Sequence, residues 1–119
     1  MNDAVNSPSH YVKRSSTIEP IDVLRWAPFD LGNCLKYITR VGLKGDEEID
    51  WKKARRYLFW AVESYEIFPD HIDWFFAHHG LYLKKFSQFN RCKTNNAMDF
   101  FADVSILIKQ NIELLENRE

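Results

Sequence analysis

Apolar residues in this chain recur with the 3.6-residue period of an α-helix, and no segment alternates with the two-residue period of a strand. Such stripes of apolar residues along one side of a helix, here called seams, run over about 28–41, 51–68 and 97–116. The stripe of the first segment consists of Leu31, Cys34, Leu35 and Ile38. The sequence therefore predicts an all-α fold, a compact bundle of four to five helices.

Local signals place the helix ends. A short helix begins near Pro20, which suits a first turn, and Gly42 suits the C-cap of the helix with the apolar stripe. Asp50 is a good N-cap for the next helix. An aromatic segment over 71–90 is expected to be helical, with a break at Gly80.

The length of 119 residues corresponds to one domain, 1–119. Residues 1–16 are polar and turn-rich and are expected to form a flexible N-terminal arm. Residues 17–68 form the core of the domain, and 69–119 hold aromatic-rich C-terminal helices.

The formal net charge of −1 gives no general attraction to nucleic acid or to an anionic membrane. We expect neither double-stranded nucleic acid nor a membrane as partner, since no apolar run approaches the roughly 18 residues of a membrane helix. The two cysteines form no CxxC pair, and the first residues lack the pattern of a signal peptide. The expectation is a reduced, cytoplasmic protein.

A second set of residues shares the spacing of the apolar stripe and lies on the opposite side of the same helix. It consists of Asn33, Lys36, Tyr37 and Arg40. Lysine and arginine supply charge for phosphate, arginine in a planar fork, and tyrosine stacks on a ring. The pattern is typical of a site for a phosphorylated, ring-containing ligand; the alternative is a solvated outer face.

Further cations lie close in sequence. Lys44 stands in a glycine-flanked loop that lets a ligand approach the backbone, although the chain has no P-loop. Lys53, a further candidate for binding the ligand, lies on the far side of the next helix with Arg56 and Trp60. A tryptophan there indicates a second buried surface, supplied by the C-terminal helices or by another subunit, so we expect a homo-oligomer.

Two residues of the arm, His10 and Tyr11, follow a proline. Either Tyr11 packs on the body, or the arm closes over a ligand with Tyr11 stacked and His10 touching phosphate or donating a proton.

No metal site is expected. The three histidines at 71, 78 and 79 lack ligand spacing and are interpreted as packing or surface residues. Asp99 and Asp103 stand at i, i+4, a spacing that can bind Mg²⁺ but is more typical of a solvated helix start.

Five short pieces in order resemble a small phage-encoded family, nucleotide kinase-like and mostly of unknown function, related to a coliphage deoxynucleoside-monophosphate kinase without a P-loop. They read P-x-H-Y, I-E-P-I-D, G-N-x-x-K-Y-x-x-R, K-G-D and D-x-x-K-A-x-x-Y-L, at 8–11, 18–22, 32–40, 44–46 and 50–58. The resemblance covers about half of the chain, 6–66. It departs at Pro20, where the family more often has another residue. It implies a phage origin and a nucleotide ligand.

Two functions follow as expectations. The first is a nucleoside-monophosphate kinase-like phosphotransferase, in which Asp22 or Asp50 would hold Mg²⁺ with ATP or orient the acceptor, and His10 would act as proton donor. The alternative is a non-catalytic protein that sequesters a nucleotide or cyclic nucleotide and counters host defence. A third, weaker option is an inhibitor of a host enzyme that binds through Trp60 and the C-terminal half.

Overall fold

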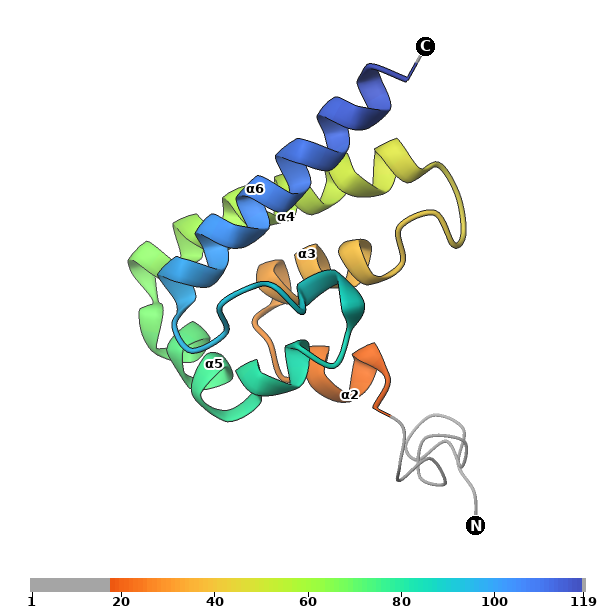
Figure 1. The fold of residues 1–119 in the computed structure, drawn as a ribbon. Helices are drawn as coiled ribbons and strands as arrows, with labels where there is room; N and C mark the ends of the chain where they lie inside the picture. Colours follow the sequence, from red (N-terminus) through yellow and green to blue (C-terminus); the bar gives the residue numbers. More distant parts are fainter. Residues whose placement is uncertain (1–17, 119) are drawn as a thin grey trace.

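The structure is a computed structural model that describes residues 18–118, so His10 and Tyr11 lie outside the described residues. Every regular element in this range is helical, which confirms the all-α prediction (Figure 1). The elements are α2 (Pro20–Leu24), α3 (Phe29–Thr39), α4 (Glu47–Ile67), α5 (Pro69–Leu83), the 3₁₀ helix η1 (Ser87–Phe89) and α6 (Ala97–Glu116).

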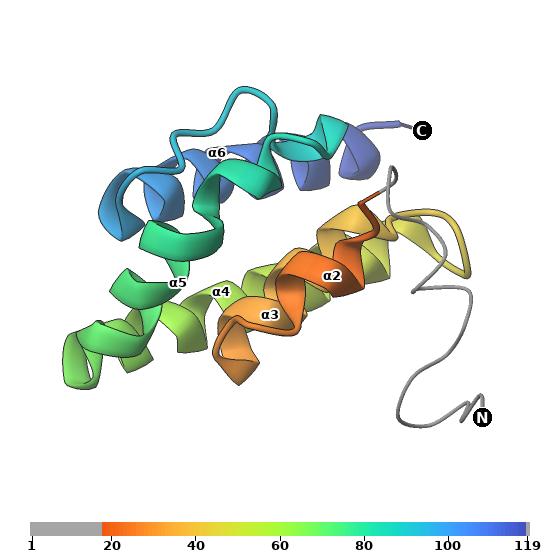
Figure 2. The same cartoon turned by 90° about the horizontal axis from the view of Figure 1, so that it is seen from below.

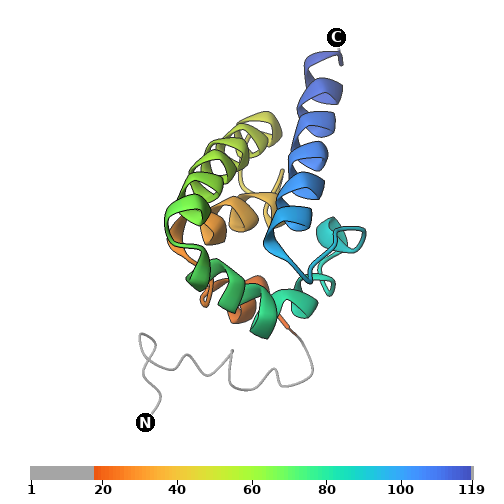
Figure 3. The ribbon, with the colours of Figure 1, turned by 90° about the vertical axis from the view of Figure 1, so that its left-hand side faces the viewer.

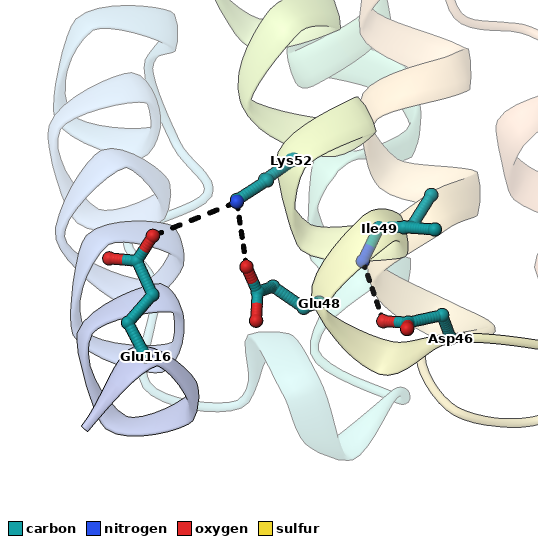
Figure 4. A network of polar contacts seen from close by, with 5 residues as sticks. All are labelled: Asp46, Glu48, Ile49, Lys52 and Glu116. Carbon is teal, nitrogen blue, oxygen red and sulfur yellow. Dashed lines mark hydrogen bonds and ion pairs between the residues drawn. The ribbon is translucent and has the colours of Figure 1, made fainter. Parts of the chain in front are cut away.

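The two longest helices, α4 and α6, lie side by side and antiparallel (Figure 1, Figure 3). Lys52 near the start of α4 pairs with Glu116 at the end of α6 at 3.6 Å (Figure 4). At the other end of the pair, the rings of Tyr65 and Phe101 meet edge to face. Figure 2 shows α5 crossing from the end of α4 towards the level of α6, with α2 lying against α3.

The core contains the apolar seams that the sequence predicts. All four residues of the α3 stripe are fully buried, and they pack on α4, where the small side chains of Ala54 and Ala61 let the two helices approach closely. Cys34 belongs to this stripe, and burial raises the pKa of its thiol. It therefore stays a protonated core residue, as the pattern indicates.

The prediction that Asp50 caps α4 is wrong. Asp46 is the N-cap, because its extended backbone lets the carboxylate accept the Ile49 N–H at 3.1 Å (Figure 4). The helix thus begins at Glu47, and Asp50 lies inside its first turns. Asp50 is buried and accepts the N–H of Gly42 at 3.3 Å, which ties the loop after α3 to α4.

Neither glycine prediction holds in full. The C-cap of α3 is Arg40, and Gly42 follows two residues later with a φ of +75°, a conformation that favours glycine. Gly80 does not break its helix: it lies inside α5, where a β-carbon would collide with the carbonyl oxygen of Thr94. Glycine at position 80 is needed for close packing against the segment before α6.

None of the helices in residues 18–118 combines the length and the apolar character needed to cross a lipid bilayer.

Candidate functional site

Two tyrosines from neighbouring helices form the centre of the candidate site. The rings of Tyr37 on α3 and Tyr57 on α4 lie nearly parallel, at 11°, with centroids 5.9 Å apart. Phe29 and Trp60 meet the Tyr57 ring edge-on, at 6.1 and 5.5 Å. The buried stripe of α3 faces α4, and this packing brings Tyr37 to the rim of the contact, where it is half-buried.

Four cations surround these rings. The Nζ atoms of Lys36 and Lys53 lie 4.9 and 5.4 Å from the centroid of the Tyr37 ring, and the guanidinium carbon of Arg40 lies 5.4 Å from it. The guanidinium of Arg56 lies 5.7 Å from the Trp60 ring. These distances are within the range of cation–π attraction. We call the surface of Lys36, Tyr37, Arg40, Lys53, Arg56, Tyr57 and Trp60 the tyrosine–cation face.

The charge of this face is not neutralised within residues 18–118. The ion pairs in that range are those of Lys52 with Glu48 and Glu116, so no described carboxylate pairs with a cation of the face. The Nε of Arg40 is buried and has no hydrogen-bond partner among the described residues. An anion on this face would therefore meet cations that need not first leave another partner.

An apolar groove of about 440 Å³ lies beside the face, between α2 and α3, and Lys36 and Asn33 line its edge. The Asn33 amide donates its Nδ2–H to the carbonyl oxygen of Phe29 at 3.1 Å. Because that carbonyl can only accept, the amide oxygen of Asn33 is the atom left to accept a bond from a ligand. The groove thus offers apolar walls and one acceptor next to the cations.

The structure gathers some of the predicted site residues and separates others. Lys36, Tyr37, Arg40 and Lys53 lie together, and Asn33 lies next to them at the groove. Lys44 stands in the exposed loop before α4 and is not among the cations over the rings.

The two carboxylates proposed as catalytic have backbone partners. Asp22 accepts the N–H of Glu19 at 2.8 Å at the start of α2. Asp50 is the buried acceptor for Gly42 described above. Each carboxylate therefore has a local role in holding the chain, and neither is in contact with the stacked rings among the described interactions.

Tyr57 and Phe29 are part of the site but were not among the site residues predicted from the sequence. Tyr57 stands four residues after Lys53, a spacing that places both on one side of α4. This was the signal available in the sequence. Trp60 lies on the same side and is 39% exposed. The helices of residues 18–118 therefore do not form the second buried surface that the sequence predicts at Trp60.

The three histidines pack around two tryptophans on the α2–α5 side. The ring of His79 is stacked on Trp26 at 5.5 Å and 3°, and that of His78 on Trp74 at 5.0 Å. Burial, together with the neighbouring His78, lowers the pKa of His79. Within the described range, no group of three or more histidine, cysteine, aspartate or glutamate residues could hold a metal ion.

Fold and surface together define a small all-α domain with a cationic, aromatic face beside an apolar groove. A family model described as a protein of unknown function (DUF3310) matches residues 5–59, a segment that contains α2, α3 and the part of α4 with Lys53 and Tyr57. No curated protein and no solved structure matches the chain.

Proposed function

We propose that the tyrosine–cation face binds a nucleotide and that the protein sequesters this ligand without converting it. The observation that carries the proposal is the group of cations around two stacked tyrosines, with no carboxylate of residues 18–118 paired to them. Phosphate oxygens would pair with Lys36, Arg40 and Lys53, and arginine offers two parallel donors to one phosphate.

The ligand's ring has two places to stack. The half-buried tyrosine pair offers an aromatic surface, and base–aromatic stacking contributes about 1–3 kcal/mol per base. The groove between α2 and α3 offers apolar walls and the acceptor of Asn33. Both places adjoin Lys36, so a nucleotide could place its phosphate on the cations from either one.

The carboxylates favour binding over phosphotransfer. A kinase needs acidic groups that hold Mg²⁺ or orient the acceptor near the phosphates. Asp22 and Asp50 are instead acceptors for backbone N–H groups. A nucleoside-monophosphate kinase-like phosphotransferase, with Mg²⁺ and ATP as cofactors, is therefore our second proposal.

The wider biological setting is also a proposal. The resemblance implies a phage origin, and we propose that the protein acts in the cytoplasm of the infected cell. Sequestration would there counter host defence if the ligand is a nucleotide signal. The family model that matches residues 5–59 has no assigned function and agrees with either proposal.

The test is to incubate the purified protein with a panel of linear and cyclic nucleotides, ATP and Mg²⁺, and to separate bound from free material before chromatography. A ligand that is retained and chemically unchanged supports sequestration. A new diphosphate overturns it in favour of the kinase. If nothing is retained and nothing is converted, the nucleotide proposal fails.

A matched pair of variants locates the binding. Lys36→Glu/Lys53→Glu reverses two charges of the face, whereas Lys84→Glu/Lys85→Glu reverses two exposed charges just after α5. Equal net charge in the two variants removes general electrostatic attraction as an explanation. We expect retention to be lost only in the first. Equal loss in both would contradict binding at the tyrosine–cation face.

A further inference from the structure

A hollow of about 380 Å³ lies between α4 and α6, on a different side of α4 from Tyr57. Its apolar part consists of Leu58, Phe59, Val62 and Phe101. Phe59 is 62% exposed and stacks on no other ring of residues 18–118, which is unusual for a large aromatic residue. A second hollow, of about 430 Å³, continues along the same two helices and shares Arg55, Leu58 and Ser105 with the first.

The charges along the hollow are segregated. Arg55 stands on its side towards the start of α4, and Glu63 and Glu66 stand towards the end of the helix. Arg55, Phe59, Val62 and Glu66 follow one another at i, i+4, i+7 and i+11, which places them in one row along the helix. Neither Arg55 nor Glu66 forms an ion pair with another residue of 18–118. The row is thus basic at one end, apolar in the middle and acidic at the other.

We infer that a second copy of this chain covers the hollow, with the two α4 helices antiparallel about a two-fold axis. Such an axis through the middle of the row places Arg55 against Glu66 of the partner subunit and Phe59 against Val62 of the partner subunit. The same pairs recur on the other side of the axis, as in every two-fold interface. The row complements itself in charge only in this antiparallel arrangement, because a parallel one would oppose like charges.

The proposed interface leaves the stacked tyrosines open, and it adjoins the tyrosine–cation face only at Arg56, which lines a hollow together with Arg55 and Phe59. At 100° per residue, Phe59 and Val62 lie roughly 140–160° around α4 from Tyr57. The dimer therefore does not depend on the nucleotide proposal, and either can fail without the other. It also gives the predicted homo-oligomer a definite surface, one that differs from the Trp60 side.

A charge-swap series tests the interface, read by analytical ultracentrifugation over a range of concentrations. The variants are Arg55→Glu, Glu66→Arg and the double variant with both changes; Lys85→Glu is the control. Both residues are exposed, so circular dichroism is expected to show an unchanged helical fold. Each single variant opposes like charges twice per dimer, and we expect its dissociation constant to rise at least about tenfold.

The double variant is the decisive one. It again places opposite charges against each other across the interface, with the acidic side chain now at position 55 and the basic one at position 66. We expect it to recover the dimer, and Lys85→Glu to behave as the unmodified chain. The inference is overturned if the unmodified chain is a monomer at about 100 µM, a concentration at which even a weak specific dimer is populated. It is equally overturned if the single variants dimerise normally, or if the folded double variant stays monomeric. A monomeric chain that instead binds another protein through this hollow would also refute self-association.

Discussion

The ammonium of Lys53 on α4 lies 5.4 Å from the ring centroid of Tyr37 on α3, so one helix supplies a cation to the aromatic ring of the other. Because Lys36 and Arg40 reach the same ring from α3, the site exists only when the two helices are packed together. Binding at this face therefore depends on the contact between α3 and α4 as well as on the individual side chains.

Arg40→Ala is expected to weaken nucleotide binding strongly while the helical fold persists. The guanidinium contributes charge next to Tyr37, and its buried Nε has no partner in the described part of the chain. Hydrogen bonds to charged groups contribute about 1.5–3 kcal/mol each, so the loss in affinity is at least roughly tenfold. Isothermal titration calorimetry measures it, with Lys85→Ala as control. Unchanged affinity in a folded variant would refute the role of Arg40.

Tyr57→Phe and Tyr57→Ala separate the ring of Tyr57 from its hydroxyl. The ring stacks on Tyr37 and meets Phe29 and Trp60 at its edges. Phenylalanine keeps these contacts, so we expect near-normal affinity, whereas alanine removes the stack and weakens binding by about 1–3 kcal/mol. Equilibrium dialysis with the retained nucleotide provides the comparison. Equal affinities for the two variants would show that the stack plays no part.

Asp50→Ala is expected to lower the free energy of unfolding by about 1–3 kcal/mol, because it leaves the N–H of Gly42 without its acceptor. Chemical denaturation with urea measures this change. A role of Asp50 in phosphotransfer predicts something else, namely that Asp50→Asn stays stable but no longer forms product. Loss of turnover without loss of stability would contradict the structural role assigned here.

Gly80→Ala is expected to lower the free energy of unfolding by about 1–3 kcal/mol, the usual cost of overpacking. The added carbon meets the Thr94 carbonyl, so the segment before α6 must move. Gly45→Ala is the control, since a β-carbon at position 45 has no neighbour within 4 Å. Thermal melts of both variants make the comparison. A Gly80→Ala protein that melts with the unmodified chain would refute the close contact.

The fold is expected to lose stability on acidification through His79. Burial lowers its pKa in the folded state, so below the unfolded value of about 6.5 the unfolded chain binds the proton more readily. Stability is therefore highest above that pH and falls as the pH decreases towards the folded-state value. His79→Phe keeps a ring against Trp26 but cannot titrate, and its stability curve should be flatter between about pH 7 and 5. A slope unchanged by the substitution would exclude His79 as its source.

Local signals sufficed for much of the fold. The α6 helix spans 97–116 as its seam indicates, and Asn96 is its N-cap, because both signals lie in the segment itself. The start of α4 was misplaced because Asp46 and Asp50 are equally good caps by type. The choice between them depends on where the loop from Gly42 folds back, which is not a local property.

The candidate site was also predicted only in part: residues within one helix were predicted, and contacts between helices were not. The cations and Tyr37 follow from spacing within α3, and Lys53 follows from spacing within α4. The stack of Tyr37 on Tyr57 depends on the rotation and offset of α3 against α4, which only the packed structure gives. The roles of Asp22 and Asp50 also had to be seen in three dimensions, since a carboxylate that holds a backbone N–H has the same sequence signature as one that binds a metal.

The most direct test of nucleotide binding at the tyrosine–cation face is an NMR titration of ¹⁵N-labelled protein with the nucleotide that the panel retains. Binding at this face should give saturable amide shifts that are concentrated in α3 and in the first half of α4, around Lys36, Arg40, Lys53 and Tyr57. These shifts should weaken with added salt, which screens the cations from phosphate. Shifts confined to α5 and α6, or no shifts with any nucleotide of the panel, would contradict it.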